Sequence, residues 1–170
     1  YAAKGRPNFN PLIVHVPNFL LAETLGMFGD AESALAEHFW PGPLTMVVEK
    51  TPDCPVASLA TAGLDTIAIR VPQHRAMQAL LMKTGRPLAA PSANASGKVS
   101  PTRAEHVKAS LEGRVALVLD DGPCTAGVES TIIRVKDGAI EVLRPGPVTA
   151  EELAAVSGLE VRGVVGSEVI

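Results

Sequence analysis

Aromatic side chains, cysteines and positive charge are all scarce in this sequence, and each shortage excludes a class of protein. Aromatics make up 4% of the 170 residues, which leaves few rings for a platform that stacks nucleic-acid bases. The formal net charge of −3 argues against a basic surface that coats nucleic acid, so any anion site must be a local cluster. Cys54 and Cys124 stand far apart and outside any C-x-x-C motif, so we expect reduced thiols, with neither a disulfide framework nor a zinc site.

Long apolar runs are also missing. No stretch is long enough to span a membrane and no signal-peptide pattern is present, so we expect a cytoplasmic protein without a membrane partner. Hydrophobic residues nevertheless make up 46% of the chain, which is enough for one large domain with its own core.

Short apolar runs alternate with helical patterns along the chain. Strands are expected at 12–16, 44–49, 65–71, 88–90, 115–119, 130–135 and 139–143, and helices at 30–39, 76–84, 102–111 and 149–156. Capping boxes open the helices at Thr102 and Thr149, and Lys136-Asp137-Gly138 is typical of a hairpin turn. Because hairpins accompany the strand–helix alternation, we expect an α/β fold with a mixed parallel and antiparallel sheet. The tail from Ser157 has no clear element and is interpreted as a linker.

The stretch from Pro91 to Thr102 concentrates small hydroxyl- and amide-bearing side chains around Gly97. It is either a cradle for a phosphate or nucleotide or a plain Ser/Pro/Gly loop. Lys4 and Arg6, separated by one glycine, either converge on an anion or form a solvated basic pair.

Three further polar groups stand at strands or strand ends. His15 lies in an apolar strand and is either a hydrogen-bonded core residue or a site residue. Arg70 requires a partner, which is either a structural carboxylate or the carboxylate of a ligand. Ser130 either forms a turn or directs its hydroxyl into a cleft. The Ser elbow of hydrolases, the Lys-containing P-loop and the dinucleotide G-x-G-x-x-G are all missing, so these residues together suit a nucleotide-like anion bound without those motifs.

Seven blocks, in this order, resemble the YrdC-like threonylcarbamoyl-AMP synthases over roughly residues 4–147. The blocks are KGRP at 4–7, NPLIVH at 10–15, FWPGPLT at 39–45, AIRVP at 68–72, PSANASG at 91–97, SPT at 100–102 and GVESTI at 127–132. Within them, Lys4/Arg6 match the K-x-R element of the family signature and Ser92/Asn94 match its S-x-N element.

The resemblance implies a YrdC-like twisted open sheet flanked by helices, and a reaction in which threonine, bicarbonate and ATP give threonylcarbamoyl-AMP and pyrophosphate. It implies a catalytic group of Lys4, Arg6, Ser92 and Asn94, ATP contacts from Arg6, Asn10, Thr66, Ser92, Ser100 and Arg144, and threonine contacts from His15, Arg70, the backbone at Ala90, and Ser130. ATP is then a substrate, Mg²⁺ arrives on its phosphates, and no metal is held by protein side chains alone.

The product implied by the resemblance serves the threonylcarbamoyl modification of adenosine 37 in tRNA, with tRNA-modification enzymes and tRNA as further partners. The family also has an upstream Pro-Thr-Glu-Thr block with a first strand and helix. We therefore expect residues 1–156 to form a catalytic domain lacking that strand and helix, inactive on its own, and residues 157–170 to begin an interdomain linker. Two alternatives remain: a carbamoyl-transfer domain of the hydrogenase-maturation type and a non-catalytic RNA-binding module of the same fold.

Overall fold

One mixed sheet organises the molecule in the computed structural model, which describes residues 1–124 and 127–163. Its strands are β1 (Ile13–His15), β2 (Leu44–Glu49), β3 (Thr66–Arg70), β4 (Leu88–Ala89), β5 (Thr131–Lys136), β6 (Ala139–Arg144) and β7 (Glu160–Arg162), in the order β4-β1-β3-β2-β5-β6-β7. Three neighbouring pairs are parallel (β1/β3, β2/β5, β6/β7) and three are antiparallel (β1/β4, β2/β3, β5/β6), which confirms the expected mixed sheet.

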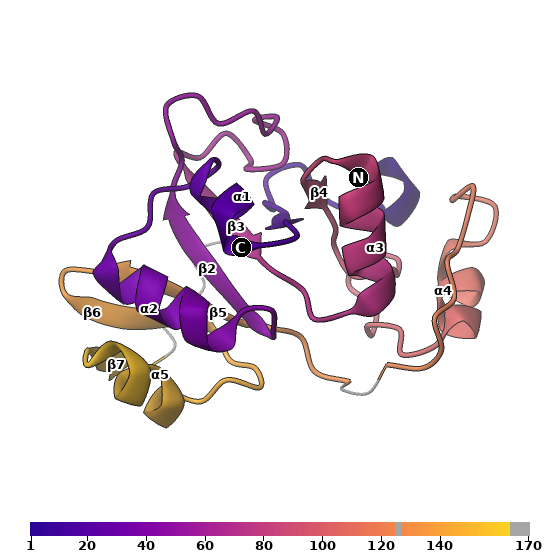
Figure 1. Ribbon diagram of the computed structural model, residues 1–170. Coiled ribbons are helices and arrows are strands. Elements are labelled where there is room, and N and C mark those ends of the chain that lie inside the picture. The colour runs from indigo at the N-terminus through magenta and orange to yellow at the C-terminus, as the bar shows by residue number, and fades with distance from the viewer. Residues whose placement is uncertain (125–126, 164–170) are drawn as a thin grey trace.

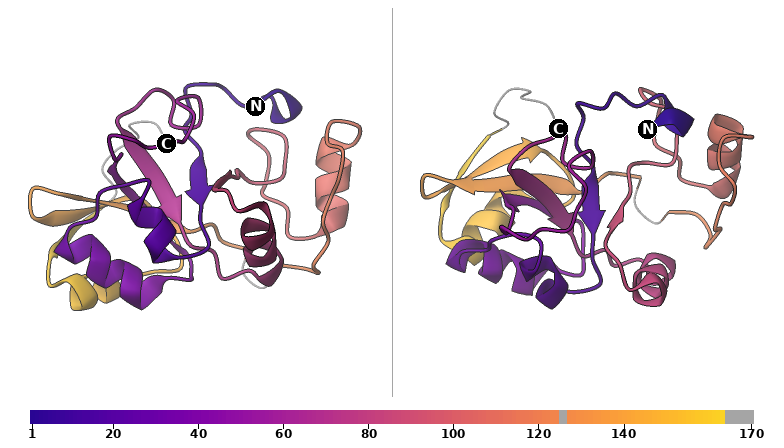
Figure 2. Two further views of the ribbon diagram at one scale, coloured as in Figure 1. Left: turned by 45° about the horizontal axis from the view of Figure 1, so that its top comes forward. Right: turned by 90° about the horizontal axis from the view of Figure 1, so that it is seen from above.

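The helices divide into two groups. They are η1 (Ala2–Lys4, a 3-10 turn), α1 (Phe19–Glu23), α2 (Asp30–Phe39), α3 (Arg75–Thr84), α4 (Ala104–Leu111) and α5 (Ala150–Ser157). Helices α1, α2 and α5 gather beside β2, β5 and β6, whereas α3 and α4 lie toward the β4 end (Figures 1 and 2). None of the described helices is long and apolar enough to cross a membrane.

The core lies where the central strands meet α2 and α5. Its fully buried side chains include Leu35 of α2, Leu44 and Met46 of β2, Ile67 and Ile69 of β3, Ile133 of β5 and Leu153 of α5. The alternation in β2 and β3 sends these large apolar groups into the core, as the period of two predicts.

Local sequence signals explain most element boundaries. Asp137 and Gly138 both have positive φ, as a two-residue hairpin turn requires, and they join β5 to β6 as predicted. The predicted capping box at Thr149 forms, because its hydroxyl accepts from Glu152 N while the Glu152 carboxylate accepts from Thr149 N. Gly85 ends α3 in the left-handed conformation.

One expected strand and one expected helix cap are wrong. Residues 115–119 form no strand: Leu117 is 74% exposed and Leu119 62% exposed, because this apolar run pairs with no described strand. The capping box at Thr102 does not form either. Helix α4 has Arg103 at its N-cap without a side-chain bond, because Thr102 is directed to the His106 ring instead.

Two elements were missed. Helix α1 begins after Asn18, whose carboxamide oxygen accepts from Leu21 N at 2.9 Å. This helix has only five residues, which is too short to show a helical pattern in the sequence. Strand β7 occupies part of the tail interpreted as linker, and it is recruited by pairing with β6 rather than by its own pattern. The sheet thus continues beyond the expected domain end at residue 156, while residues 164–170 lie outside the described part of the chain.

Candidate functional site

A cavity of about 620 Å³ brings together most of the residues singled out in the sequence. It lies against β1 and β3 and is closed by loops from the second half of the chain. The predicted site residues that line it are Arg6, His15, Arg70, Ala90, Ser92, Ser100, Ser130 and Arg144. Residues separated by more than a hundred positions therefore share one pocket, as the expectation of a common anion site required.

His15 and Arg70 form the floor of this pocket at the ends of two parallel strands, where they are directly paired in register. Arg70 Nε donates to Gly42 O at 2.9 Å, and the guanidinium forms no salt bridge with any described residue. Burial, and then the nearby charge of Arg144, lower the pKa of Arg70 from its usual value. A half-buried guanidinium with its terminal nitrogens unpaired is suited to receive a carboxylate.

His15 is 8% exposed, and its Nδ1 is buried without a hydrogen-bond partner among the described residues. Burial, and then the positive charge of Arg70, lower the pKa of His15 to about 4. The imidazole is therefore neutral near pH 7, and its Nδ1 is enclosed by protein rather than open to the pocket.

Another wall of the pocket is a hydrogen-bonded group around Ser130. Arg144 donates from Nε to Ser130 O at 3.1 Å and from Nη2 to Ser130 Oγ at 3.0 Å. Ser130 Oγ also lies 2.8 Å from Thr45 Oγ1. Because β5 and β2 are parallel and adjacent, Thr45 and Ser130 reach the same end of the sheet, and the serine hydroxyl is held in one place.

Glu129 is a pocket residue that sequence reasoning missed. Its Oε1 accepts from Ser100 Oγ at 2.5 Å and its Oε2 accepts from Arg144 Nη1 at 2.5 Å. The sequence feature that could have identified Glu129 is its position directly before Ser130 in the GVESTI block. A carboxylate is not expected in a pocket for an anion unless it orients the cations there.

Arg6 enters the pocket from the segment after η1. Its Nη2 donates to Pro11 O at 2.8 Å and its Nε approaches Asn10 O at 3.4 Å. These carbonyls fix one edge of the guanidinium and leave Nη1 without a bond to the described residues. Arg6 can thus hold its position and still donate to a ligand.

Four predicted site residues do not line the pocket: Lys4, Asn10, Thr66 and Asn94. Thr66 stands at the start of β3, paired with Glu49, about 13 Å along the strand from Arg70. Asn10 contributes its backbone carbonyl to Arg6. Lys4 and Asn94 contact each other directly beneath the Ser92 loop, with Lys4 Nζ 3.2 Å from Asn94 Oδ1.

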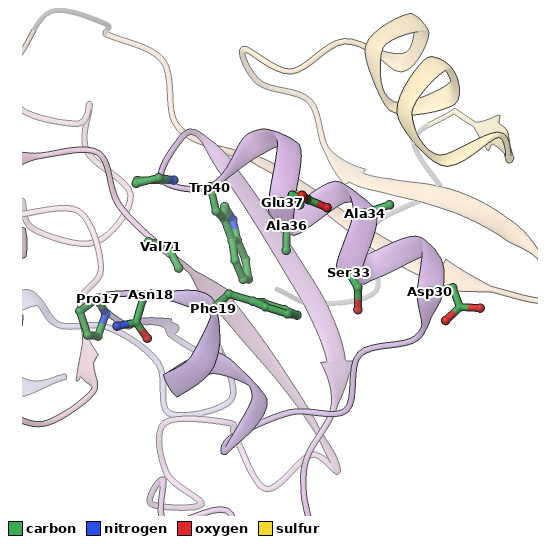
Figure 3. Close-up of a pocket in the computed structure, with 11 residues that line it drawn as sticks. Pro17, Asn18, Phe19, Asp30, Ser33, Ala34, Ala36, Glu37, Trp40 and Val71 are labelled. Atoms are coloured by element: carbon green, nitrogen blue, oxygen red, sulfur yellow. The ribbon is translucent and has the colours of Figure 1, made fainter.

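A second cavity, also of about 620 Å³, lies between the start of α1 and the length of α2 (Figure 3). Its lining includes Phe19, Trp40, Asp30 and Glu37 and contains no lysine or arginine. Two carboxylates without a cation disfavour a polyphosphate, so charge distinguishes the two cavities. The described residues also contain no group of three His, Cys, Asp or Glu side chains placed to hold a metal ion.

Comparison with known proteins shows the family of this chain. The Sua5/YciO/YrdC family model, described as telomere recombination, matches residues 1–146. The threonylcarbamoyl-AMP synthase of Bacillus subtilis is 48% identical over 93% of this chain and 46% of its own length, and that of Pyrococcus abyssi is 44% identical over the same shares. The crystal structure of P. abyssi Sua5 complexed with L-threonine superposes with a TM-score of 0.88 at 42% identity, covering 95% of this chain and 47% of that one.

The chain spans about half the length of these curated relatives. Within that half, the match over residues 1–146 includes every predicted site residue that lines the pocket, from Arg6 to Arg144. The chain belongs to the Sua5/YciO/YrdC family.

Proposed function

We propose that this chain is the catalytic part of an L-threonylcarbamoyladenylate synthase, a nucleotidyltransferase that converts threonine, bicarbonate and ATP to threonylcarbamoyl-AMP and pyrophosphate. The observation that carries the proposal is the guanidinium of Arg70, which lines the pocket beside His15 and forms no salt bridge with any described residue. An amino acid supplies the carboxylate that this guanidinium lacks. The relative crystallised with L-threonine agrees with this choice of substrate.

In this proposal, ATP lies toward the Arg6, Ser92, Ser100 and Arg144 side of the same pocket. Two guanidinium groups and two hydroxyls there suit a triphosphate. Mg²⁺ comes bound to the phosphates, because that ion needs few protein ligands when a nucleotide supplies the others.

The chemistry demands positioning rather than a covalent nucleophile. Bicarbonate releases CO₂ and hydroxide, the neutral threonine amine adds to the CO₂ to form a carbamate, and the proton that the amine loses combines with the hydroxide as water. A carbamate oxygen then attacks the α-phosphorus of ATP, and pyrophosphate leaves. Arg70 fixes the amino acid and the cations of the other wall neutralise the phosphates, so the two substrates meet in one orientation.

The product would be consumed in the cytoplasm by an enzyme that transfers the threonylcarbamoyl group to adenosine 37 of tRNA. Contact with that enzyme and with tRNA belongs to the proposal as well. The net charge of −3 leaves such contact to a local surface rather than to the whole chain.

The test is pyrophosphate release by the intact protein. We expect release only when threonine and bicarbonate are both present. Equal release with either omitted would contradict the proposal. Arg70→Lys should weaken threonine binding at least tenfold in calorimetry, because it loses the planar fork. Arg134→Lys, a change of the same kind on the Arg134–Glu141 pair of β5 and β6, should leave threonine binding unchanged.

A further inference from the structure

The ammonium group of Lys4 is fully occupied within the protein. Its Nζ donates to the backbone oxygens of Ser92 and Asn94 and to Asn94 Oδ1. An ammonium has three protons, so three acceptors satisfy it completely. Neither Lys4 nor Asn94 lines the pocket.

The carboxamide of Asn94 is equally occupied. It is 3% exposed, and its Nδ2 donates to Lys98 O at 2.6 Å and to Val99 O at 3.1 Å. Its Oδ1 accepts from Lys4. Asn94 and Lys4, the last residue of η1, thus form a junction that holds both ends of the 92–99 loop, and the bond from Ser96 N to Lys4 O at 2.8 Å strengthens it.

The two serines that the loop delivers to the pocket lie on either side of this junction. Ser92 precedes Asn94, and Ser100 follows the carbonyls that Asn94 holds. If the junction opened, both hydroxyls would lose their fixed positions together.

We propose that Lys4 and Asn94 are positioning residues: they form a clamp that shapes the 92–100 loop and do not contact the triphosphate of the bound nucleotide. The nucleotide half of this inference rests on the proposed function, whereas the loop half does not. Burial, and then the adjacent charge of Arg6, lower the pKa of Lys4 from its usual value.

The first experiment is hydrogen exchange of the backbone amides of 92–100 in the purified chain without any ligand. Lys4→Met and Asn94→Ala should each speed exchange there about tenfold or more, because the clamp holds the loop closed. Lys98→Met removes an exposed lysine from the same loop and should change exchange little. Unchanged exchange in both clamp variants would overturn the proposal.

The second experiment compares ATP with AMP by calorimetry. A clamp acts on both nucleotides alike, so Lys4→Met should raise both dissociation constants about tenfold and keep their ratio within about twofold. Arg6→Met, which removes a pocket cation, should weaken ATP more than AMP. A Lys4→Met variant that loses ATP affinity but keeps AMP affinity would identify Lys4 as a direct phosphate ligand. If the parent chain binds neither nucleotide, the proposed function fails, and the exchange experiment still decides the clamp.

Discussion

Arg144 and Glu129 form an ion pair inside the candidate nucleotide pocket, with Arg144 Nη1 2.5 Å from Glu129 Oε2. The other carboxylate oxygen accepts from Ser100 Oγ, so a single negative charge links two groups proposed to meet ATP. Four donor contacts of Arg144 already go to Glu129 and Ser130, which holds the guanidinium in one orientation. The carboxylate orients the cation, but it also repels an incoming phosphate.

Replacing this charge should strengthen nucleotide binding. Glu129→Gln keeps an oxygen for Arg144 and a side chain of the same shape, while the repulsion of the phosphates disappears. For a partly exposed group this corresponds to about 2–5-fold tighter ATP binding. Calorimetry at low and at high salt measures the effect, which should shrink as salt screens the charges.

Glu160→Gln provides the matched control, because it removes the same charge from the exposed strand β7. Its ATP affinity should equal that of the parent chain. Weaker ATP binding by Glu129→Gln would mean that the orienting role of the carboxylate outweighs its repulsion.

The sequence predicted the sheet class and most strands because those signals are local. The alternation in Ile67, Ile69 and Val71 and the Asp137-Gly138 turn each specify their structure within a few residues. Strand β7 and the apolar run at 115–119 show the limit: whether a short segment becomes a strand depends on a neighbour with free backbone groups.

For the candidate site, the sequence predicted which residues meet but not which contacts they make. Family motifs named the residues that converge on the pocket, such as Arg6 and Ser130, but motifs do not give contacts. They could not distinguish Lys4, whose donors are consumed by the loop, from Arg6, which retains free donors. Glu129 was overlooked because its role exists only through Ser100 and Arg144, which are distant in the chain.

The buried ring of His15 should make the free energy of unfolding depend on pH. Its pKa is about 4 in the folded chain and near 6.5 in the unfolded chain, so the unfolded chain binds more protons between these values. The stabilising contribution is complete above about pH 6.5 and is lost as pH falls to about 4. The difference amounts to roughly 3 kcal/mol.

Denaturant unfolding at several pH values between 4.5 and 7 measures this dependence. His15→Gln should flatten it, since glutamine does not titrate. His38→Gln, which changes an exposed histidine of α2, should leave the slope unchanged. Equal slopes in the parent chain and in His15→Gln would contradict the assignment of the effect to His15.

Gly146 lies against the start of β5 so closely that a side chain cannot fit. A Cβ there would stand 2.4 Å from Thr131 N and 2.6 Å from Glu129 O, and both are backbone atoms that cannot rotate away. Gly146→Ala should therefore displace the Glu129–Thr131 segment and cost about 1–3 kcal/mol of stability, lowering Tm by roughly 2–12 °C. Because Ser130 lies in that segment, threonine and ATP affinity should fall as well. Gly163→Ala adds the same methyl group where no described atom beyond the chain neighbours lies within 4 Å, and its Tm should stay within about 2 °C of the parent. Calorimetric scans measure the Tm of both variants. If the Gly146→Ala chain is as stable as the Gly163→Ala chain, the backbone at Gly146 shifts at little cost, and its close packing is not what fixes Ser130.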